Sequence, residues 1–467
     1  MDSRDLVVVA NRLPVHEVRS RSGSRWETSP GGLVSALKPL LQQKGGTWIG
    51  WLGRASTNAP EPFVHEDIRN VPIALKRQDV KDYYEGFSNA TLWPLYHDCL
   101  RPPIYRRRWW HSYIEINRRF ADAAARIAAP GSDVWIHDYQ LQLVPQFLRE
   151  RRPDLRIGFF LHIPFPPTEI FSRLPWRRQI VDGLMGADVI GFQRKRGAQN
   201  FVALAKRHAG ARGRRGRLHV NGHALECAAF PISIDFKSFD ARAREHETQK
   251  RAGTLARRLG SGRKVFLGID RLDYTKGIDA RLLAYAELLE RGRVQTEDVV
   301  LVQTAVPSRE NVPAYQEERE KIERLVGEIN GRFGRIGRAA VHYVHRSLPF
   351  DELVALYLLA DVMLVTPLRD GMNLVAKEFV ASCVDDRGVL ILSEFAGAAD
   401  ELDKALSVNP HDLDGVIQAM EHALSMPETE VTQRMRAMRK RVREHDVHAW
   451  ARSFLACLAR ARESAPA

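Results

Sequence analysis

The chain has few cysteines and no long apolar run. Its 467 residues include four cysteines, which lie far apart and form no CxxC pair: Cys99, Cys227, Cys383 and Cys457. This spacing predicts free thiols in a reducing compartment rather than a disulfide framework or a zinc site. No stretch of 18 apolar residues is present, so no membrane span is expected.

The amino-terminal sequence and the absence of common nucleotide-binding motifs limit the cellular compartment and the class of enzyme. The first residues, MDSRDLVVVANR, lack the basic and long apolar segments of a secretory signal, so we expect a cytoplasmic protein. Neither G-x-G-x-x-G nor G-x-x-x-x-G-K-[ST] occurs, which weighs against a dinucleotide oxidoreductase and a P-loop NTPase. The D-x-D triplet at 412–414 is interpreted as a helix N-cap, and histidines and carboxylates elsewhere show no metal-binding spacing.

The charge balance is strongly basic, with a formal net charge of +13 at pH 7 and a pI near 9.7. Such a balance is compatible with nucleic acid, acidic lipid or anionic small molecules as partners. The main clusters are YRRRWW at 105–110 and RHAGARGRRGR at 207–217, and the second is Gly-rich, as in a flexible surface loop. No nucleic-acid-binding motif accompanies them, so we interpret both as solvated surface and leave the role of 207–217 open.

Short apolar strands alternate with longer helical patterns along the chain. Runs that are apolar on both faces and separated by helices predict parallel sheets covered on both sides. Two such sets predict an α/β protein with two Rossmann-like, doubly wound domains. The predicted strands are 6–10, 133–137, 156–162 and 187–192 in the first set, and 264–269, 298–304, 340–345, 361–366 and 388–393 in the second.

The domain boundary is expected near 235–255, where FPISIDFKSFD ends the first set and a strongly polar stretch follows. We therefore predict domains at 1–240 and 241–445. Apolar residues at helical spacing predict a C-terminal amphipathic helix within 446–467, which we expect to pack back on the N-terminal domain. Because ligands bind at the carboxyl ends of strands in doubly wound domains, the cleft between two such domains is the expected site.

Groups suited to sugars and phosphates follow strands of the first set. Gly31 and Gly32 lie at a predicted helix start, where paired glycines admit a phosphate or sugar, although an ordinary helix entry would look the same. Asp138 follows the strand at 133–137, and a carboxylate there can accept hydrogen bonds from sugar hydroxyls. His162 precedes a proline-stiffened turn, and a core histidine with satisfied hydrogen bonds is the competing interpretation.

Cations follow strands of the second set. Arg271 and Lys276 lie five residues apart in DRLDYTKGID, which closes on a glycine. A planar guanidinium and a compact ammonium on one short loop suit a diphosphate, although a solvated turn with internal ion pairs is the alternative. Arg309 follows the next strand.

The segment DVMLVTPLRDGMNLVAKEF, residues 361–379, begins as a strand and ends as a helix. Gly371 permits a sharp turn, and the amides of 372–375 would form the first helical turn, which is a ready anion site. Glu378 lies further along the helix, where a carboxylate can accept bonds from ribose hydroxyls. Asp370 would lie beside the reacting centre.

Six long motifs resemble those of one family: SNATLWPLYHD, WIHDYQL, FFLHIPFPPTEIF, DRLDYTKGID, TPLRDGMNLVAKEFVA and LSEFAGAADEL. They are similar to the motifs of the trehalose-6-phosphate synthases, retaining enzymes of glycosyltransferase family 20, and the resemblance covers nearly the whole chain. It implies the GT-B fold, with two facing Rossmann-like domains. It also implies transfer of glucose from a nucleotide diphosphate glucose to glucose 6-phosphate, giving α,α-trehalose 6-phosphate.

The resemblance further implies residue roles. On the acceptor side, those that hold the phosphate or border its pocket would be Arg12, Tyr84, Arg309, Trp93, Trp48 and Asp138. On the donor side, the groups that meet the sugar, diphosphate and ribose would be Gly31, Gly32, His162, Arg271, Lys276, Asp370, Gly371, Met372, Asn373, Leu374, Val375 and Glu378. The four nearest the chemistry would be His162, Asp370, Arg271 and Lys276.

The resemblance implies a front-face reaction through an oxocarbenium-like ion pair, in which the enzyme positions the substrates and stabilises charge on the diphosphate. No metal or other cofactor is implied. The partners would be the small-molecule substrates rather than nucleic acid or membrane, and a homo-oligomer, either a dimer or a tetramer, is expected. Because UDP-, GDP- and ADP-glucose are all used within the family, the nucleotide base stays open.

Alternatives remain at two levels. Relatives with another acceptor, the glucosylglycerol-phosphate synthases and the pseudo-glycosyltransferases that join cyclitols, can keep much of this residue set. Two alternatives come from other classes of protein. One is a catalytically inactive sensor of the same fold, and the intact set of ligand-binding residues argues against it. The other is a nucleic-acid-binding protein, and only the net charge supports it. Arg369 and Lys377 have no assigned role and are interpreted as charges on the surface or behind the site.

Overall fold

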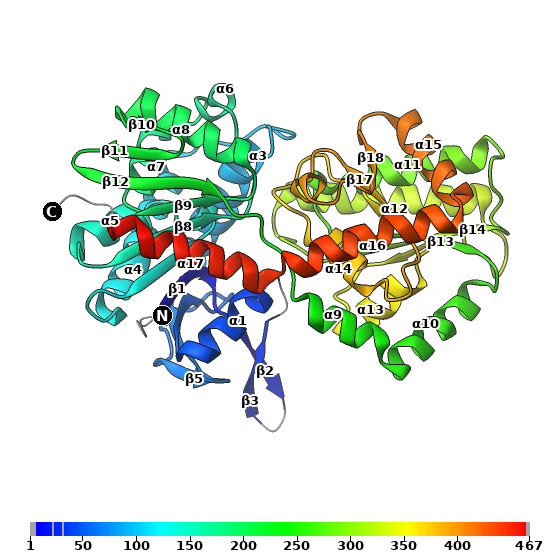
Figure 1. Ribbon diagram of the computed structural model, residues 1–467, viewed down its shortest axis with the longest axis horizontal. Helices are drawn as coiled ribbons and strands as arrows, with labels where there is room; N and C mark the ends of the chain where they lie inside the picture. Colours follow the sequence, from blue (N-terminus) through cyan, green and yellow to red (C-terminus); the bar gives the residue numbers. More distant parts are fainter. Residues whose placement is uncertain (1–5, 21–22, 30–31, 464–467) are drawn as a thin grey trace. The chain divides into compact units, whose positions relative to one another are not determined.

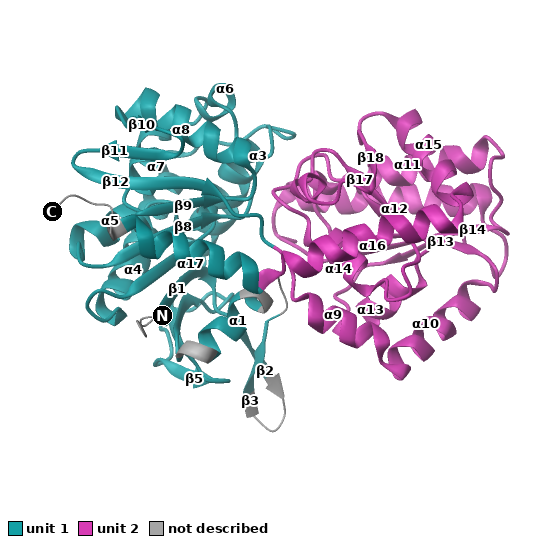
Figure 2. Ribbon diagram, viewed as in Figure 1, with its two compact units in different colours: residues 1–232, 448–467 teal, residues 233–447 magenta. Residues whose placement is uncertain are grey.

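The computed structural model describes residues 6–20, 23–29 and 32–463. The chain divides into two compact units, residues 1–232 with 448–467 and residues 233–447 (Figure 2). The first boundary therefore precedes helix α9 (Phe236–Arg244), which belongs wholly to the second unit, whereas the sequence suggested a boundary near residue 240.

The first unit is built on a ten-stranded sheet in the order β10-β11-β12-β9-β8-β7-β1-β4-β6-β5 (Figure 1). Strands from β12 to β6 in this order run parallel, and short antiparallel strands close both edges. Their bounds are β1 Leu6–Arg12, β4 Thr47–Trp51, β5 Phe63–His65, β6 Ile68–Ile73, β7 Asp133–His137, β8 Arg156–Leu161, β9 Val189–Phe192, β10 Arg212–Arg214, β11 Arg217–Val220 and β12 His223–Ala229.

Helices connect these strands, and a separate hairpin pairs β2 (Val15–Ser20) with β3 (Gly23–Thr28). The helices are α1 Gly32–Lys44, α2 Arg77–Asp79, the π-helix η1 Val80–Leu92, α3 Trp93–Tyr96, α4 Arg107–Ile127, the 3₁₀ turn η2 Tyr139–Leu141, α5 Val144–Arg151, α6 Thr168–Phe171, α7 Arg177–Leu184, α8 Lys195–Ala209 and α17 Val447–Glu463. In the sheet, β4 and β6 lie on one side of β1, and β7, β8 and β9 lie on the other side. The strand order therefore reverses between β1 and β7, which is where doubly wound sheets bind ligands.

The second unit contains a six-stranded, fully parallel sheet in the order β15-β14-β13-β16-β17-β18. The strands are β13 Lys264–Arg271, β14 Val299–Val306, β15 Val341–Val344, β16 Val362–Val365, β17 Val389–Ser393 and β18 Leu406–Val408. The other elements are α9, α10 His246–Leu259, η3 Tyr274–Lys276, α11 Ile278–Glu290, α12 Pro313–Phe333, α13 Phe350–Leu359, α14 Leu374–Ser382, η4 Gly397–Asp400, α15 Leu413–Ser425 and α16 Glu428–Glu444. Here the order reverses between β13 and β16, so the carboxyl ends of these two strands are the expected ligand site.

Every strand predicted from an apolar run is present, and all but the edge strand β15 lie inside their sheets and are largely buried. Strands β4, β6, β12 and β18 and the short antiparallel strands were not predicted. The polar segment between β1 and α1 contains the β2–β3 hairpin. The predicted N-cap at Asp412 is confirmed, since its side chain accepts a 3.0 Å hydrogen bond from the Gly415 amide.

The predicted C-terminal helix is also confirmed, as α17. Phe454 of this helix is fully buried and stacks on Trp135 of β7, with ring centroids 4.4 Å apart. Gly158 and Gly191 make room for that ring, because a Cβ atom at either position would lie within 2.8 Å of Phe454. The helix lies across the sheet of the first unit (red in Figure 1) and completes its core.

Replacing the Phe454 ring tests how much this last helix contributes to the fold. We expect Phe454→Ala to lower the free energy of unfolding by about 3–5 kcal/mol, because it leaves a cavity against Trp135. The neighbouring exposed residue gives the matched control, and Ser453→Ala should change stability by no more than about 0.5 kcal/mol. Urea denaturation of both variants measures the difference. Equal stability of the two would contradict a core role for α17.

Candidate active site

Three loops of the second unit are held together at the carboxyl ends of β13, β16 and β17. The amide of Leu368 donates to the carbonyl of Thr275 at 2.8 Å, which ties the loop after β16 to the loop after β13. The amide of Ala398 donates to the carbonyl of Met372 at 2.8 Å, which ties it to the loop after β17. The backbones approach so closely that a Cβ at Gly397 would lie 2.0 Å from the Gly371 carbonyl oxygen.

A buried arginine that the sequence did not single out supports this cluster. Arg281 of α11 is fully buried and pairs with Asp270 at 2.7 Å. It also donates to the carbonyl oxygen of Lys276 at 3.1 Å and to the hydroxyl of Thr366 at 3.0 Å. Arg281 thus links the loop after β13 to the loop after β16 through buried hydrogen bonds. Its signal in the sequence is an arginine at a position where the helix is otherwise apolar.

Lys276 and Asp370 meet at the centre of the cluster. The Lys276 ammonium lies 2.6 Å from the Asp370 carboxylate, which also accepts a 3.2 Å hydrogen bond from the side-chain amide of Asn373. Lys276 is buried and Asp370 is half-buried. A carboxylate held in this way is a fixed acceptor for hydroxyl groups, and the lysine keeps a positive charge beside it.

The helix that follows presents its first turn to the same place. Asn373 caps α14, and its side chain accepts a 3.2 Å hydrogen bond from the amide of Ala376. The geometry of a helix leaves the first-turn amides, here including those of Leu374 and Val375, without partners within the helix. Together with the positive end of the helix dipole, they suit an anion. Gly371 and Met372 are buried directly before this turn.

Glu378 lies further along the same helix and is half-buried. Its carboxylate accepts a 2.7 Å hydrogen bond from the hydroxyl of Tyr357 in α13. Burial raises the pKa of Glu378, and the bond from Tyr357 opposes that change. The tyrosine therefore fixes the carboxylate in one orientation, as a hydroxyl-binding role requires.

A second group of cations surrounds Asp273, just after β13. The Arg309 guanidinium pairs with Asp273 at 2.8 Å and also donates to the hydroxyl of Tyr315 at 2.6 Å. Burial works to raise the pKa of Asp273, but Arg309, Arg271 and Lys276 outweigh it and lower that pKa to about 2. Arg271 is exposed at the strand end, whereas the Arg309 side chain is buried. The predicted cations thus gather around one ionised carboxylate.

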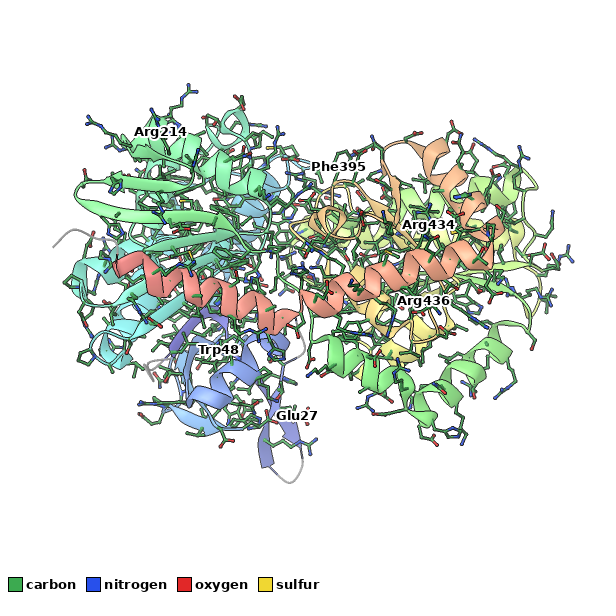
Figure 3. All side chains as sticks on the ribbon, in the orientation of Figure 1. Glu27, Trp48, Arg214, Phe395, Arg434 and Arg436 are labelled. Atoms are coloured by element: carbon green, nitrogen blue, oxygen red, sulfur yellow. The ribbon has the colours of Figure 1, made fainter. Side chains whose placement is uncertain are left out.

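In the first unit, Arg12 lies at the carboxyl end of β1 and is exposed. Its guanidinium carbon lies 5.0 Å from the ring centre of Trp51 and 5.4 Å from that of Tyr84, so two aromatic rings hold it by cation–π contacts. Trp48 (labelled in Figure 3) is only 1% exposed, and its indole donates to the carbonyl oxygen of Arg12 at 2.9 Å. Its side chain therefore supports the backbone of Arg12 and does not offer a surface of its own.

Trp93, in the short helix α3, is likewise a packing residue in this structure. It is 3% exposed, and its ring lies 4.2 Å from His97 and 5.6 Å from Tyr139. Gly32 is the first residue of α1, so the predicted helix start is confirmed there. Gly31 lies outside the described residues.

Asp138 and His162 meet at the ends of β7 and β8. The carboxylate of Asp138 accepts a 3.1 Å hydrogen bond from the backbone amide of His162. Asp138 has φ 77° and ψ 170°, a conformation that normally only glycine adopts. Strained backbone conformations of this kind cluster at functional sites. The ring of His162 lies beside that of the fully buried His137, with Nε2 and Nδ1 3.1 Å apart.

Burial lowers the pKa of His162 to about 3 and the pKa of His137 well below its ordinary value. Both imidazoles are therefore neutral at neutral pH. His162 can accept or donate a hydrogen bond there, but the neutral ring is not the imidazolium that a histidine uses as a general acid.

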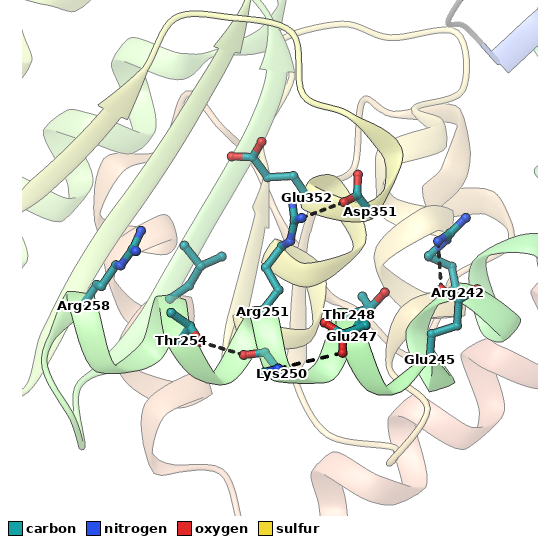
Figure 4. A pocket seen from close by; sticks show the side chains of 11 residues that line it. Arg242, Glu245, Glu247, Thr248, Lys250, Arg251, Thr254, Arg258, Asp351 and Glu352 are labelled. Carbon is teal, nitrogen blue, oxygen red and sulfur yellow. Dashed lines mark hydrogen bonds and ion pairs between the residues drawn. The ribbon is translucent and has the colours of Figure 1, made fainter.

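Two other charged regions are surface features. A hollow of about 480 Å³ lies beside α10, and its charges pair with one another (Figure 4). Arg251 lies 2.9 Å from Asp351, and Lys250 lies 3.9 Å from Glu247. The basic segment 207–217 is not the flexible loop that its glycines suggested, because it forms the end of α8 and the edge strands β10 and β11, with Arg214 exposed (Figure 3).

Within the described ranges, no group of three or more His, Cys, Asp or Glu side chains is placed to hold a metal ion. In the same part of the chain, no helix is long and apolar enough to cross a membrane.

Lys377 was interpreted as a charge either on the surface or behind the site, and its burial excludes the first and confirms the second. It is 1% exposed, and its ammonium lies 2.6 Å from Glu401, next to the segment that supports Gly371. Arg441 lies 3.9 Å from the same carboxylate. Lys377 faces into the protein because α14 is covered on both sides, which a single sequence does not reveal. Arg369 is half-buried beside the cluster.

Two doubly wound units, each with groups suited to sugars or phosphates where its strand order reverses, define the GT-B class of fold. The chain belongs to glycosyltransferase family 20, whose pattern it matches over residues 4–460.

Known proteins agree over nearly the full length. The chain is 55% identical over 473 residues to the trehalose-6-phosphate synthase of Mycolicibacterium gilvum, covering 97% of this chain and 93% of that protein. A crystal structure of a UDP-forming α,α-trehalose-phosphate synthase from Burkholderia vietnamiensis has a TM-score of 0.92 at 35% identity, covering 99% and 98% of the two chains. A Burkholderia xenovorans enzyme in complex with glucose-6-phosphate has a TM-score of 0.89 at 36% identity, covering 97% and 100%.

The buried pair of Lys377 and Glu401 can be tested by removing one partner. We expect Lys377→Ala to cost about 3–5 kcal/mol of stability, because Glu401 is left charged and buried. Replacing both partners by apolar residues, K377M with E401L, should recover most of that loss. The exposed pair of Lys404 and Asp403 is the control, and Lys404→Ala should cost less than about 1 kcal/mol. A chemical-denaturation series reports all three, and a small effect of Lys377→Ala would count against the pair.

The lowered histidine pKa values predict a stability change with pH. In the unfolded chain a histidine takes up a proton near pH 6.5, whereas His162 does so only near its lowered pKa of about 3. The unfolded state therefore binds more protons in this window, and stability falls as the pH is lowered through it.

We expect His162→Gln to flatten this fall by at most about 1.4 kcal/mol per pH unit between about pH 6.5 and 4. Urea titrations at several pH values measure the slope. The exposed His219→Gln provides the control and should leave the slope as in the wild type. An unchanged slope in His162→Gln would show that His162 titrates normally in the folded protein.

Proposed function

We propose that the protein transfers glucose from UDP-glucose to glucose 6-phosphate, with retention, and so forms α,α-trehalose 6-phosphate. The observation that carries this proposal is the loop at 370–378, where the Lys276–Asp370 contact, the helix start and Glu378 follow one another along the chain. That order matches the order of groups in a nucleotide diphosphate sugar. The named activity of the Mycolicibacterium gilvum relative and the UDP-forming reaction of the Burkholderia vietnamiensis enzyme support it.

On this proposal the second unit binds the donor. Asp370 and the amides of Gly371, Met372 and Asn373 hold the sugar hydroxyls. The amides of Leu374 and Val375, with Arg271 and Lys276, hold the diphosphate. Glu378, oriented by Tyr357, binds the ribose.

The first unit binds the acceptor at the carboxyl ends of β1 and β7. Arg12, held over two aromatic rings, meets the phosphate together with Tyr84. Arg309, a residue of the second unit, is proposed as a further ligand of the phosphate, as the family resemblance implies. Asp138 is proposed to accept from acceptor hydroxyls, and Trp93 and Trp48 to act through packing. Gly31 and Gly32 keep the donor-side role that the resemblance implies. The complex of the Burkholderia xenovorans enzyme with glucose-6-phosphate supports this choice of acceptor.

The reaction is proposed to proceed on one face of the sugar. The donor's glycosidic bond breaks as the acceptor hydroxyl approaches, and the leaving diphosphate takes that hydroxyl's proton. Asp370 is already bonded to Lys276 and Asn373, so it serves to position the sugar rather than to attack it. Arg271, Lys276 and the helix start stabilise the charge on the leaving group, which lets the reaction run without a metal ion.

We also propose a cellular compartment, the binding partners and an oligomeric state. All four cysteines are free thiols, which suits a reducing cytoplasm. The proposed partners are the two small-molecule substrates rather than nucleic acid, and a homo-oligomer is expected. Size-exclusion chromatography with light scattering would distinguish a dimer or tetramer from a monomer.

A direct assay tests the activity. Incubation with UDP-glucose and glucose 6-phosphate should give UDP and trehalose 6-phosphate in equal amounts, measured by liquid chromatography and mass spectrometry. GDP-glucose and ADP-glucose in the same assay give kcat/KM for each base. Transfer to glycerol 3-phosphate with none to glucose 6-phosphate would replace this proposal with the glucosylglycerol-phosphate alternative.

Substitutions at the diphosphate site test the donor contacts. We expect Arg271→Ala and Lys276→Ala each to lower kcat about 10²- to 10³-fold, because each removes positive charge from the developing diphosphate. The exposed Arg293→Ala, whose side chain pairs with Glu421 at 3.5 Å, is the matched control and should keep wild-type rates. Circular dichroism confirms that the variants fold. Near-normal turnover in both test variants would remove the diphosphate role.

A further inference from the structure

His137 lies behind His162 and has no role in the site described so far. It is the last residue of β7 and is 0% exposed, so no substrate can reach it. Its Nδ1 atom lies 3.1 Å from Nε2 of His162, the residue that follows β8. Because burial keeps both rings neutral, one proton is shared between the two facing nitrogens.

The surroundings of His137 decide which ring donates that proton. Its other nitrogen, Nε2, is buried and has no hydrogen-bond partner among the residues that the structure describes. The ring centroid of Trp135 lies 4.8 Å from that of His137, and the ring of Phe160 lies 6.4 Å away. An N–H group is attracted to aromatic rings, whereas a bare lone pair is repelled by their negative faces. Of the two tautomers of His137, we therefore take the one with the proton on Nε2 and with Nδ1 as the acceptor, because the aromatic surroundings favour an N–H group over a bare lone pair.

This choice fixes the state of His162. If His137 accepts at Nδ1, then Nε2 of His162 must carry the hydrogen that is donated. A neutral imidazole has only one N–H, so Nδ1 of His162 is left as a hydrogen-bond acceptor. The backbone of His162 is held as well, by the bond from its amide to Asp138 at 3.1 Å, so the ring has little freedom to turn.

We infer that His137 is a positioning residue that holds His162 in the tautomer with Nδ1 free to accept a hydrogen bond from a hydroxyl of the transferred sugar. The inference rests on the proposed function, which sets His162 beside that sugar. A neutral acceptor orients the hydroxyl and adds no charge near the oxocarbenium-like centre. His137 acts only through His162, as the supporting partner of a metal-bound or catalytic histidine does.

Kinetics of three variants test this role. His137→Phe keeps the ring shape and removes both nitrogens, and we expect kcat to fall about 10- to 100-fold while KM for glucose 6-phosphate stays near the wild-type value. His137→Asn restores a polar group close to the position of Nδ1 and should recover much of the loss. In a His162→Ala background, His137→Phe should have no further effect on kcat. An additive loss in that background, or an unchanged kcat in the single variant, would overturn the inference.

The tautomer of His162 can also be measured directly, without an activity assay. Nitrogen NMR of histidine-labelled wild-type protein, with His162 assigned by comparison with His162→Gln, should show Nε2 protonated and Nδ1 unprotonated. A proton on Nδ1 of His162 would overturn the inference even if the enzyme is active. Absence of trehalose 6-phosphate formation by the wild type would instead overturn the proposed function, and the NMR result would still report on the histidine pair. If His137→Phe does not fold, His137→Asn and the NMR experiment carry the test.

Discussion

The site in the second unit depends on the close approach of backbones that only small residues allow. Gly277, with φ 61°, places the loop after β13 against the carbonyl of Thr366, and Gly397 reaches the carbonyl of Gly371. Arg281 then joins these loops through a buried charge that Asp270 neutralises. A buried charge is tolerated only when its partners are in place, so this pair requires one arrangement of the loops. Lys276 and Asp370 owe their contact to that arrangement.

In the first unit, different interactions hold the residues at the strand ends in place. Its strand ends carry an exposed arginine held between aromatic rings and a histidine held by another histidine. Asp138 is kept in a conformation that costs energy, on the order of 1–3 kcal/mol. The surrounding core, completed by Phe454 of α17, supplies the rigidity that makes such strain sustainable. Positioning in both units therefore comes from buried groups directly behind the residues proposed to meet the substrates.

Strands that form one long apolar run were predictable, whereas β4, β6, β12, β18 and the short antiparallel strands were not. Most of the predicted strands are apolar on both faces, and this pattern is visible in the sequence without any partner. The hairpins β2–β3 and β10–β11 carry polar and basic residues, so their pairing has no clear local signal. The segment at 207–217 looked like a loop for this reason. The sequence could not decide whether Lys377 lies on the surface or behind the site, because only Glu401 of a distant segment explains its burial.

Residue types and spacing alone predicted the α/β class and the strand ends that carry candidate ligand-binding groups, whereas the family came from the resemblance of six long motifs. The sequence predicted a helix start after Gly371, with 372–375 as the first turn, because a glycine and an apolar helical run are local signals. The helix begins slightly later, at Leu374, with Asn373 as its cap. The sequence could not reveal Arg281, Tyr357 or His137, nor that Trp48 is buried beneath Arg12. These contacts join residues from separate elements, and their energies depend on burial and distance. Such quantities exist only once the chain has folded.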